Sequence, residues 1–223
     1  SITEYKQRPK VYRAQIGPPA WIGAIHKHEA VPYRINKDML DLMEQLQANG
    51  KLNPEETDED RHLTETFLEE ARRLADHEKF YQRMHLDFRG RMYTSRSRVN
   101  YQGDEQYRSL IEFAEGVELD DSGYEALLYH AANLWEPAVL PKGHGPKFHS
   151  YVTVGKWMLE EFISYADNPI GTYDQWQTNS LSGNEIDDPL LFIRACMELR
   201  DATTKKRLIK KKGYVTHLPV EVD

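Results

Sequence analysis

The residues with the clearest chemical potential form one short run, Asp87-Phe88-Arg89-Gly90-Arg91. Arg89 and Arg91 carry planar donor forks that match the oxygens of a phosphate group. Gly90 permits a tight bend or the close approach of another backbone, and Asp87 can hold one arginine in place by an ion pair. The run therefore suits a phosphate-bearing ligand. The alternative interpretation is a surface turn with solvated arginines.

Two further polar segments could serve the same chemistry. A turn of polar residues follows at 100–104, and Arg108 comes shortly after it. Near the C-terminal end, six bases and no acid stand between Lys205 and Lys212, among them Lys210, Lys211 and Lys212. These lysines either contact a nucleic-acid backbone with salt-dependent strength or form a solvated helix end beside the negative end of the helix dipole. The sequence leaves both interpretations open.

Other kinds of site are disfavoured. His26, His28, His144 and His149 have no cysteine partner and no His-Glu-x-x-His spacing, so a metal site built from them is not expected. Cys196 is the single cysteine, which excludes an internal disulfide, and its helical spacing from apolar neighbours favours a buried thiol over a nucleophile. Tyr173 and Trp176 could stack on bases, but packing at a helix start is the favoured interpretation.

The charges are strongly segregated along the chain. The 223 residues carry a net charge of −7, which is unusual for a dedicated nucleic-acid-binding module. Five acids crowd into residues 55–60, whereas six arginines and only three acids stand between Arg83 and Arg108. A basic face can therefore exist on an acidic protein. Apolar stretches fall far short of the roughly 20 residues of a membrane helix, so we expect no membrane partner. The single cysteine favours a reducing compartment, so we expect a cytoplasmic location.

The elements that must position these residues follow from periodicity and from breaker residues. Prolines and glycines in residues 1–35 predict an extended arm. Helices are predicted from an Asn36 N-cap to Asn49-Gly50, from His62 to Met84, from a Ser122 cap to Leu134, over 148–165, and from Pro189 to about Thr204. Strand, turn and strand are predicted around 86–93, and a strand over 214–222. The predicted fold class is α+β and helix-rich.

The order of several motifs resembles the single-subunit DNA-dependent RNA polymerases of phages and mitochondria. The Asp-x-x-Gly-Arg box at 87–91 is followed by Gln102-Gly103 and by 113–116, Phe-Ala-Glu-Gly, before a helix. Upstream, 33–37 looks like the family's segment leading out of the thumb. Downstream, 188–192 opens a helix like the family's pre-palm helix, and 217–223, ending at Asp223, is similar to the strand that carries the first catalytic aspartate. The resemblance covers about residues 32–223.

The resemblance implies a division of the chain into parts of a polymerase core. It implies a thumb-like helical segment at 36–84, a first part of the palm with the box at 85–120, a helical palm insertion at 121–212, and a palm strand at 213–223. Asp87, Gly90 and Arg91, with Arg89 between them, match the box that lies against the template strand and the RNA–DNA hybrid. Arg108 matches a basic residue that faces the hybrid.

The same resemblance assigns catalysis to Asp223, which matches the aspartate that holds two magnesium ions. One carboxylate cannot hold that metal pair alone. The family's fingers helix and its His-Asp pair are missing from these residues, and no His-Asp dipeptide occurs. The resemblance therefore implies a part of a DNA-dependent RNA polymerase that is inactive alone.

The partners expected from this resemblance are a DNA template, an RNA–DNA hybrid, nucleoside triphosphates and a second polypeptide with the missing motifs. The chain is either one subunit of a split, heterodimeric phage polymerase that transcribes phage genes in an infected bacterium, or part of a longer chain. A non-catalytic nucleic-acid-binding or scaffold protein is the alternative function.

Overall fold

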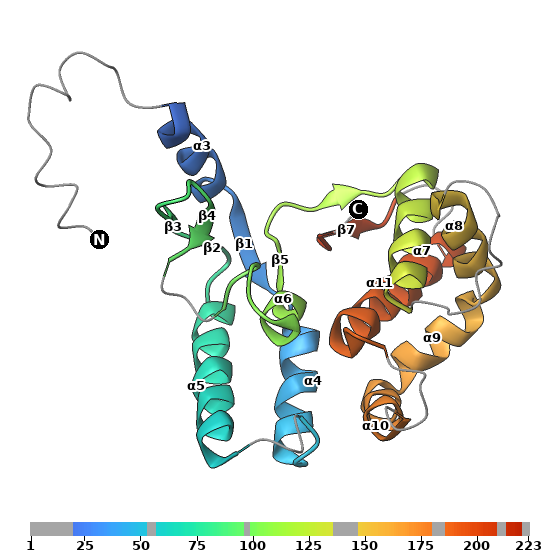
Figure 1. The fold of residues 1–223 in the computed structure, drawn as a ribbon. Coiled ribbons are helices and arrows are strands. Elements are labelled where there is room, and N and C mark those ends of the chain that lie inside the picture. Colours follow the sequence, from blue (N-terminus) through green and yellow to red (C-terminus); the bar gives the residue numbers. More distant parts are fainter. Residues whose placement is uncertain are drawn as a thin grey trace, which may run out of the picture.

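The computed structural model describes residues 20–52, 57–95, 99–135, 147–179, 186–208 and 213–219. Helices dominate and the strands are short and antiparallel, which confirms the expected helix-rich α+β class (Figure 1). In chain order the elements are α3 (Ala20–Glu29), β1 (Pro32–Ile35), α4 (Lys37–Ala48), α5 (Asp58–Ala75), β2 (Phe80–Tyr81), β3 (Met84–Leu86), β4 (Met92–Thr94), α6 (Glu105–Leu110), β5 (Ile111–Phe113), β6 (Val117–Glu118), α7 (Asp121–Trp135), α8 (Lys147–Trp157), α9 (Leu159–Asp167), α10 (Pro169–Asn179), α11 (Pro189–Leu208) and β7 (Val215–Thr216). In the described ranges, no helix combines the length and apolar character needed to cross a membrane.

A three-stranded antiparallel sheet of order β2-β1-β5 occupies the centre of one half of the molecule. Tyr33 of β1 lies opposite Phe80 and Phe113 on the neighbouring strands. Its ring stacks on Phe113 at 5.7 Å and on Tyr101 at 5.6 Å between centroids. Aromatic pairs across strands stabilise a small sheet that has few hydrogen bonds.

Helices α4 and α5 extend together from this sheet (Figure 1). Asn36 caps α4 as predicted, because its Oδ1 accepts a hydrogen bond from the Met39 amide at 2.9 Å. Thr57 and Asp60 form a capping box at the start of α5. The apolar faces of both helices enter a core that also receives residues of α10 and α11: Met39, Met43, Leu46, Phe67, Ala71, Tyr173, Leu190 and Ile193.

A second core lies among helices α7, α8, α9 and α11, on the other side of Figure 1. Phe162 and Phe192 meet edge to face at 5.3 Å, and Cys196 is buried among apolar side chains, as predicted. A Cβ at Gly155 of α8 would stand 2.5 Å from the Leu128 carbonyl oxygen of α7, so these helices approach too closely for any side chain there.

The structure corrects five expectations about local structure. The helix predicted over 148–165 is instead two helices, α8 and α9, separated at Met158. Residues 20–35 are not an extended arm, because they form α3 and β1; residues 1–19 of that prediction lie outside the described residues. The helix predicted to reach Met84 ends at Ala75 and gives way to β2 and β3. Asp120, not Ser122, caps α7, since its Oδ1 accepts from the Gly123 amide at 2.7 Å. Within 213–219, the C-terminal strand is only β7.

Candidate nucleic-acid interface

The Asp-x-x-Gly-Arg box forms the turn of the β3–β4 hairpin, where strand, turn and strand were predicted. The Gly90 amide donates to the Asp87 carbonyl at 3.1 Å, and the Asp87 amide donates to the Arg91 carbonyl at 2.9 Å. Gly90 has φ +81°, in the left-handed region that residues with a side chain rarely adopt. Glycine is therefore required at this position by the turn itself.

The Asp87 carboxylate holds the turn from within. Its Oδ1 accepts from the amides of Arg89 at 2.8 Å and Arg91 at 2.9 Å, and its Oδ2 accepts from Nε of Arg91 at 2.9 Å. Partial desolvation raises the pKa of Asp87, but the hydrogen bonds from Arg91 and Arg89 outweigh it and hold this pKa below its ordinary value. The ion pair expected between Asp87 and an arginine is thus made with Arg91, which Asp87 orients.

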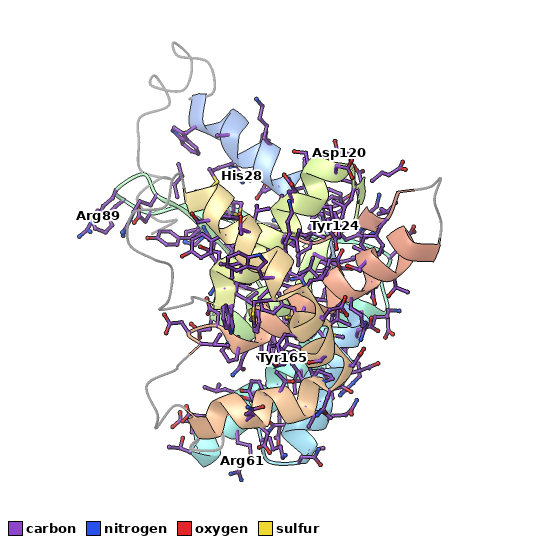
Figure 2. All side chains as sticks on the ribbon, turned by 90° about the vertical axis from the view of Figure 1, so that its right-hand side faces the viewer. His28, Arg61, Arg89, Asp120, Tyr124 and Tyr165 are labelled. Carbon is purple, nitrogen blue, oxygen red and sulfur yellow. The ribbon has the colours of Figure 1, made fainter. Side chains whose placement is uncertain are left out.

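The outer side of the turn is left to Phe88 and Arg89. The Phe88 side chain is 90% exposed, and the Arg89 guanidinium carbon lies 5.1 Å from the centre of its ring. Figure 2 shows Arg89 projecting away from the body of the molecule at the end of the hairpin. An exposed aromatic ring beside an exposed guanidinium is a surface that can stack on a base and bind a phosphate. Phe88 was not among the residues predicted for the site, although its position inside the box was a signal for it.

Gln102 fixes the hairpin from the side. Its Oε1 accepts from the Thr94 amide at 2.7 Å, and its Nε2 donates to the Met92 carbonyl at 3.0 Å. The side chain thereby pairs with strand β4 as a neighbouring strand would. The polar turn at 100–104 therefore positions the hairpin.

Arg108 lies on another element and has a different partner. Its Nη2 donates to both carboxylate oxygens of Asp188, at 3.1 and 3.2 Å, and so joins α6 to the start of α11. The side chain is 26% exposed. The structure therefore brings Asp87, Arg89, Gly90 and Arg91 together on one turn and places Arg108 at a helix junction; its contact with a hybrid stays a prediction.

The C-terminal candidates lie outside the described residues. These are Lys210, Lys211, Lys212 and Asp223. The chain that leads toward Asp223 is nevertheless anchored: the Phe113 amide donates to the His217 carbonyl at 3.0 Å, and Nδ1 of His217 lies 2.9 Å from the Phe113 carbonyl oxygen. In the ranges that the structure describes, no group of three or more metal-ligating side chains assembles.

A cavity of about 680 Å³ between the β1–α4 junction and α11 has the opposite electrostatic character. Six carboxylate side chains line it, against one arginine, Arg34, and one lysine, Lys37. Nε of Arg34 is paired with Oε1 of Glu112 at 2.6 Å, so its charge is largely compensated. The acidic lining repels phosphates. Contact with nucleic acid is therefore expected at the hairpin and not in this cavity.

Comparisons with known proteins identify relatives of the chain as a whole. No family model matches the chain. It is 29% identical over 207 residues to "DNA-directed RNA polymerase 3B, chloroplastic" of Nicotiana tabacum, covering 88% of this chain and 19% of that protein. It is 31% identical over 153 residues to "Probable DNA-directed RNA polymerase" of Neurospora crassa, covering 69% of this chain and 14% of that protein. It is 32% identical over 147 residues to "DNA-directed RNA polymerase, mitochondrial" of Mus musculus, covering 66% of this chain and 11% of that protein.

These matches extend over most of the chain, and all three relatives are DNA-directed RNA polymerases by name. The chain belongs to the family of the single-subunit, phage-type DNA-directed RNA polymerases. It spans only about a fifth, or less, of the length of the curated relatives quoted above. The resemblance predicted from the motifs is confirmed.

Proposed function

We propose that this chain supplies part of the catalytic core of a DNA-directed RNA polymerase and that its β3–β4 hairpin contacts the template strand or the RNA–DNA hybrid. The observation that carries the proposal is the exposed pair Phe88 and Arg89, held on a turn that Asp87, Arg91 and Gln102 make rigid. Membership of the polymerase family supports nucleotidyl transfer on a DNA template with nucleoside triphosphates as substrates.

The structure suggests distinct roles for the two arginines of the box. Nε and Nη2 of Arg91 are both engaged by Oδ2 of Asp87, each at 2.9 Å, so Arg91 chiefly positions the turn. Arg89 has its guanidinium over the exposed Phe88 ring and extends into solvent. Arg89 is therefore the proposed phosphate-binding residue, with Phe88 as the stacking residue.

Magnesium enters this proposal only through Asp223. A two-metal site would supply electrostatic stabilisation of the attacking and leaving oxygens during nucleotide addition. One aspartate needs further carboxylates, and the family's second metal aspartate is not among these residues. We propose that the fingers helix and the second metal aspartate lie either on a second polypeptide of a split phage polymerase or elsewhere in a longer chain, and that these 223 residues alone are inactive.

The proposal is tested by binding to a short RNA–DNA hybrid over a range of salt concentrations. Arg89→Ala should lower the slope of log K against log salt by about one, because one phosphate contact is lost. Phe88→Ala should weaken binding about fivefold or more at every salt concentration, as expected for one lost stacking contact.

Arg61→Ala is the matched control, because Figure 2 shows Arg61 at the bottom of the molecule, well away from Arg89 at its left edge. It should leave both the slope and the affinity unchanged. Equal effects of Arg61→Ala and Arg89→Ala would show that binding is a general electrostatic effect and would remove the hairpin from the interface.

A further inference from the structure

The segment 213–219, which includes β7, is joined to the neighbouring strands by backbone hydrogen bonds. The Leu119 amide donates to the Tyr214 carbonyl at 2.7 Å, and the Phe113 amide donates to the His217 carbonyl at 3.0 Å. Between these two contacts, β7 pairs with β6. The segment is thereby fixed to the β5–β6 region.

Glu198 of helix α11 holds the same segment through its side chains. Oγ1 of Thr216 donates to Oε1 of Glu198 at 2.5 Å, and the Tyr214 hydroxyl is also hydrogen-bonded to this carboxylate. The Leu218 amide in turn donates to Oγ1 of Thr216 at 3.2 Å. One carboxylate therefore holds the side chains at positions 214 and 216 directly and, through Thr216, the backbone at position 218.

Helix α11 is itself fixed to the sheet, so the Glu198 carboxylate has a firm base. Arg194, one turn earlier in α11, has a side chain that is 3% exposed, and its Nη1 donates to the carbonyls of Arg108 at 3.1 Å and Ile111 at 2.7 Å. The helix also packs within the second core, where the neighbouring Leu199 is buried. A functional group on a helix held in this way is placed more precisely than one on a loop.

The end of the segment is restricted in direction as well. Pro219 has a fixed φ, and the residue before a proline is biased toward extended conformations. The Leu218 side chain is buried in the second core. Asp223 follows four residues after Pro219. Glu198 therefore helps to fix the point from which the chain runs to the proposed catalytic aspartate.

We propose that Glu198 is a positioning residue for nucleotide addition, acting through Thr216 and Tyr214 on the strand that leads to Asp223. The inference rests on the proposed function, because it takes Asp223 to be the catalytic aspartate. As a positioning residue, Glu198 determines where Asp223 stands and does not contact the reacting groups. A misplacement of about 1 Å at a catalytic group can cost about a hundredfold in rate.

The test measures the single-turnover rate constant for adding one nucleotide, with the assembled polymerase on an RNA–DNA scaffold. Thr216→Val removes the hydroxyl and should lower this rate constant about tenfold or more. Thr216→Ser retains the hydroxyl and should keep the rate constant within about twofold of the unchanged enzyme. A purely structural role would lower the amplitude of the reaction, which counts the active complexes, and would leave the rate constant unchanged.

A double substitution tests whether Glu198 acts through Thr216. Glu198→Met keeps an unbranched side chain without the carboxylate and should lower the rate constant about tenfold or more. Adding Thr216→Val to Glu198→Met should lower it by less than about threefold further, because both substitutions remove the same hydrogen bond. Fully multiplicative effects of the two substitutions would overturn the proposal.

Thr203→Val is the matched control. Thr203 is buried on the same helix, and its Oγ1 is hydrogen-bonded to the Tyr124 hydroxyl at 2.6 Å. The substitution removes a hydrogen bond of the same kind, but one that joins α11 to α7 instead of to the segment 213–219. It should leave the rate constant unchanged, and equal slowing by Thr203→Val and Thr216→Val would overturn the proposal.

Amide hydrogen exchange in the same assemblies tests the anchor without reference to activity. Exchange across 213–219 should be about tenfold faster or more with Glu198→Met and unchanged with Thr203→Val. Unchanged exchange with Glu198→Met, or unchanged rate constants with Thr216→Val and Glu198→Met, would overturn this inference alone. If the unchanged assembly adds no nucleotide, the proposed function and the positioning role fail together, and the exchange result still decides whether Glu198 anchors the segment.

Discussion

Replacing Glu105 by glutamine is expected to change how the stability of this protein depends on pH. Oε1 of Glu105 accepts hydrogen bonds from the amides of Leu190 and Leu191 at the start of α11, the latter at 3.2 Å. Burial raises the pKa of Glu105 from its ordinary value of 4.5 to about 7, although these amides and Arg108 oppose the rise. Glutamine keeps an acceptor oxygen for the two amides and removes the titration.

The sign follows from proton binding. Between about pH 4.5 and pH 7 the folded protein holds the Glu105 proton more tightly than the unfolded chain does, so this group stabilises the fold at low pH and loses that stabilisation as pH rises through 7. Over pH 8 to pH 5 the Glu105 contribution amounts to about 2–3 kcal/mol in favour of pH 5.

His130 has the opposite effect over the same range. Burial lowers its pKa from 6.5 to about 4, so the unfolded chain binds a proton that the folded protein does not. Acidification from pH 8 to pH 5 therefore destabilises the fold through His130 by about 2 kcal/mol. The two contributions nearly cancel in the unchanged protein.

Urea unfolding of single variants at pH 8 and pH 5 separates the contributions of Glu105 and His130. With Glu105→Gln, the change in unfolding free energy on going to pH 5 should be about 2–3 kcal/mol less favourable than in the unchanged protein. With His130→Gln it should be about 2 kcal/mol more favourable. If both variants show the same pH dependence as the unchanged protein, neither group is buried as the structure has it and the reasoning is refuted.

Three further predictions concern the turn and the cores. Gly90→Ala should destabilise the protein by about 1–2 kcal/mol in a denaturation assay, because Gly90 has a positive φ. Gly23→Ala is its control: Gly23 lies in helix α3 with equally open space around it, so the substitution should be neutral or stabilising. Equal effects of the two substitutions would contradict the turn geometry. Phe67→Ala should cost about 3–5 kcal/mol, and a loss below 1 kcal/mol would show that the ring is not in the core. The Cys196 thiol, whose pKa burial raises, should react with a thiol reagent only after denaturation, and rapid labelling of the native protein would contradict its burial.

Local signals accounted for much of the fold. Asn36 before an apolar helical pattern marked the start of α4, and the β3–β4 hairpin followed from apolar and aromatic residues on either side of Gly90. Such features depend on a few neighbouring residues, which the sequence displays directly. The helix predicted from His62 ended early because Asp76, His77 and Glu78 interrupt its apolar face, a polar break that periodicity alone underestimated.

The partners of the charged residues could not be predicted in the same way. Asp188 is 80 residues from Arg108, and Ile111 is 83 residues from Arg194, so these pairs exist only after α6 and α11 pack together. Arg194 lies in a helix with mixed polarity and gave no sign of being buried. In contrast, the partners Asp87 and Arg91 are four residues apart, and their pairing was anticipated.

The most direct test of the central claim is templated primer extension on an RNA–DNA scaffold with Mg²⁺ and nucleoside triphosphates. The assembly purified from the native cell is compared with the chain alone and with assemblies that carry Asp223→Ala or Arg89→Ala. We expect extension by the assembly, none by the lone chain, none with Asp223→Ala, and early release of the hybrid with Arg89→Ala. Scaffold binding without extension by either preparation would contradict the polymerase proposal and identify a non-catalytic nucleic-acid-binding protein.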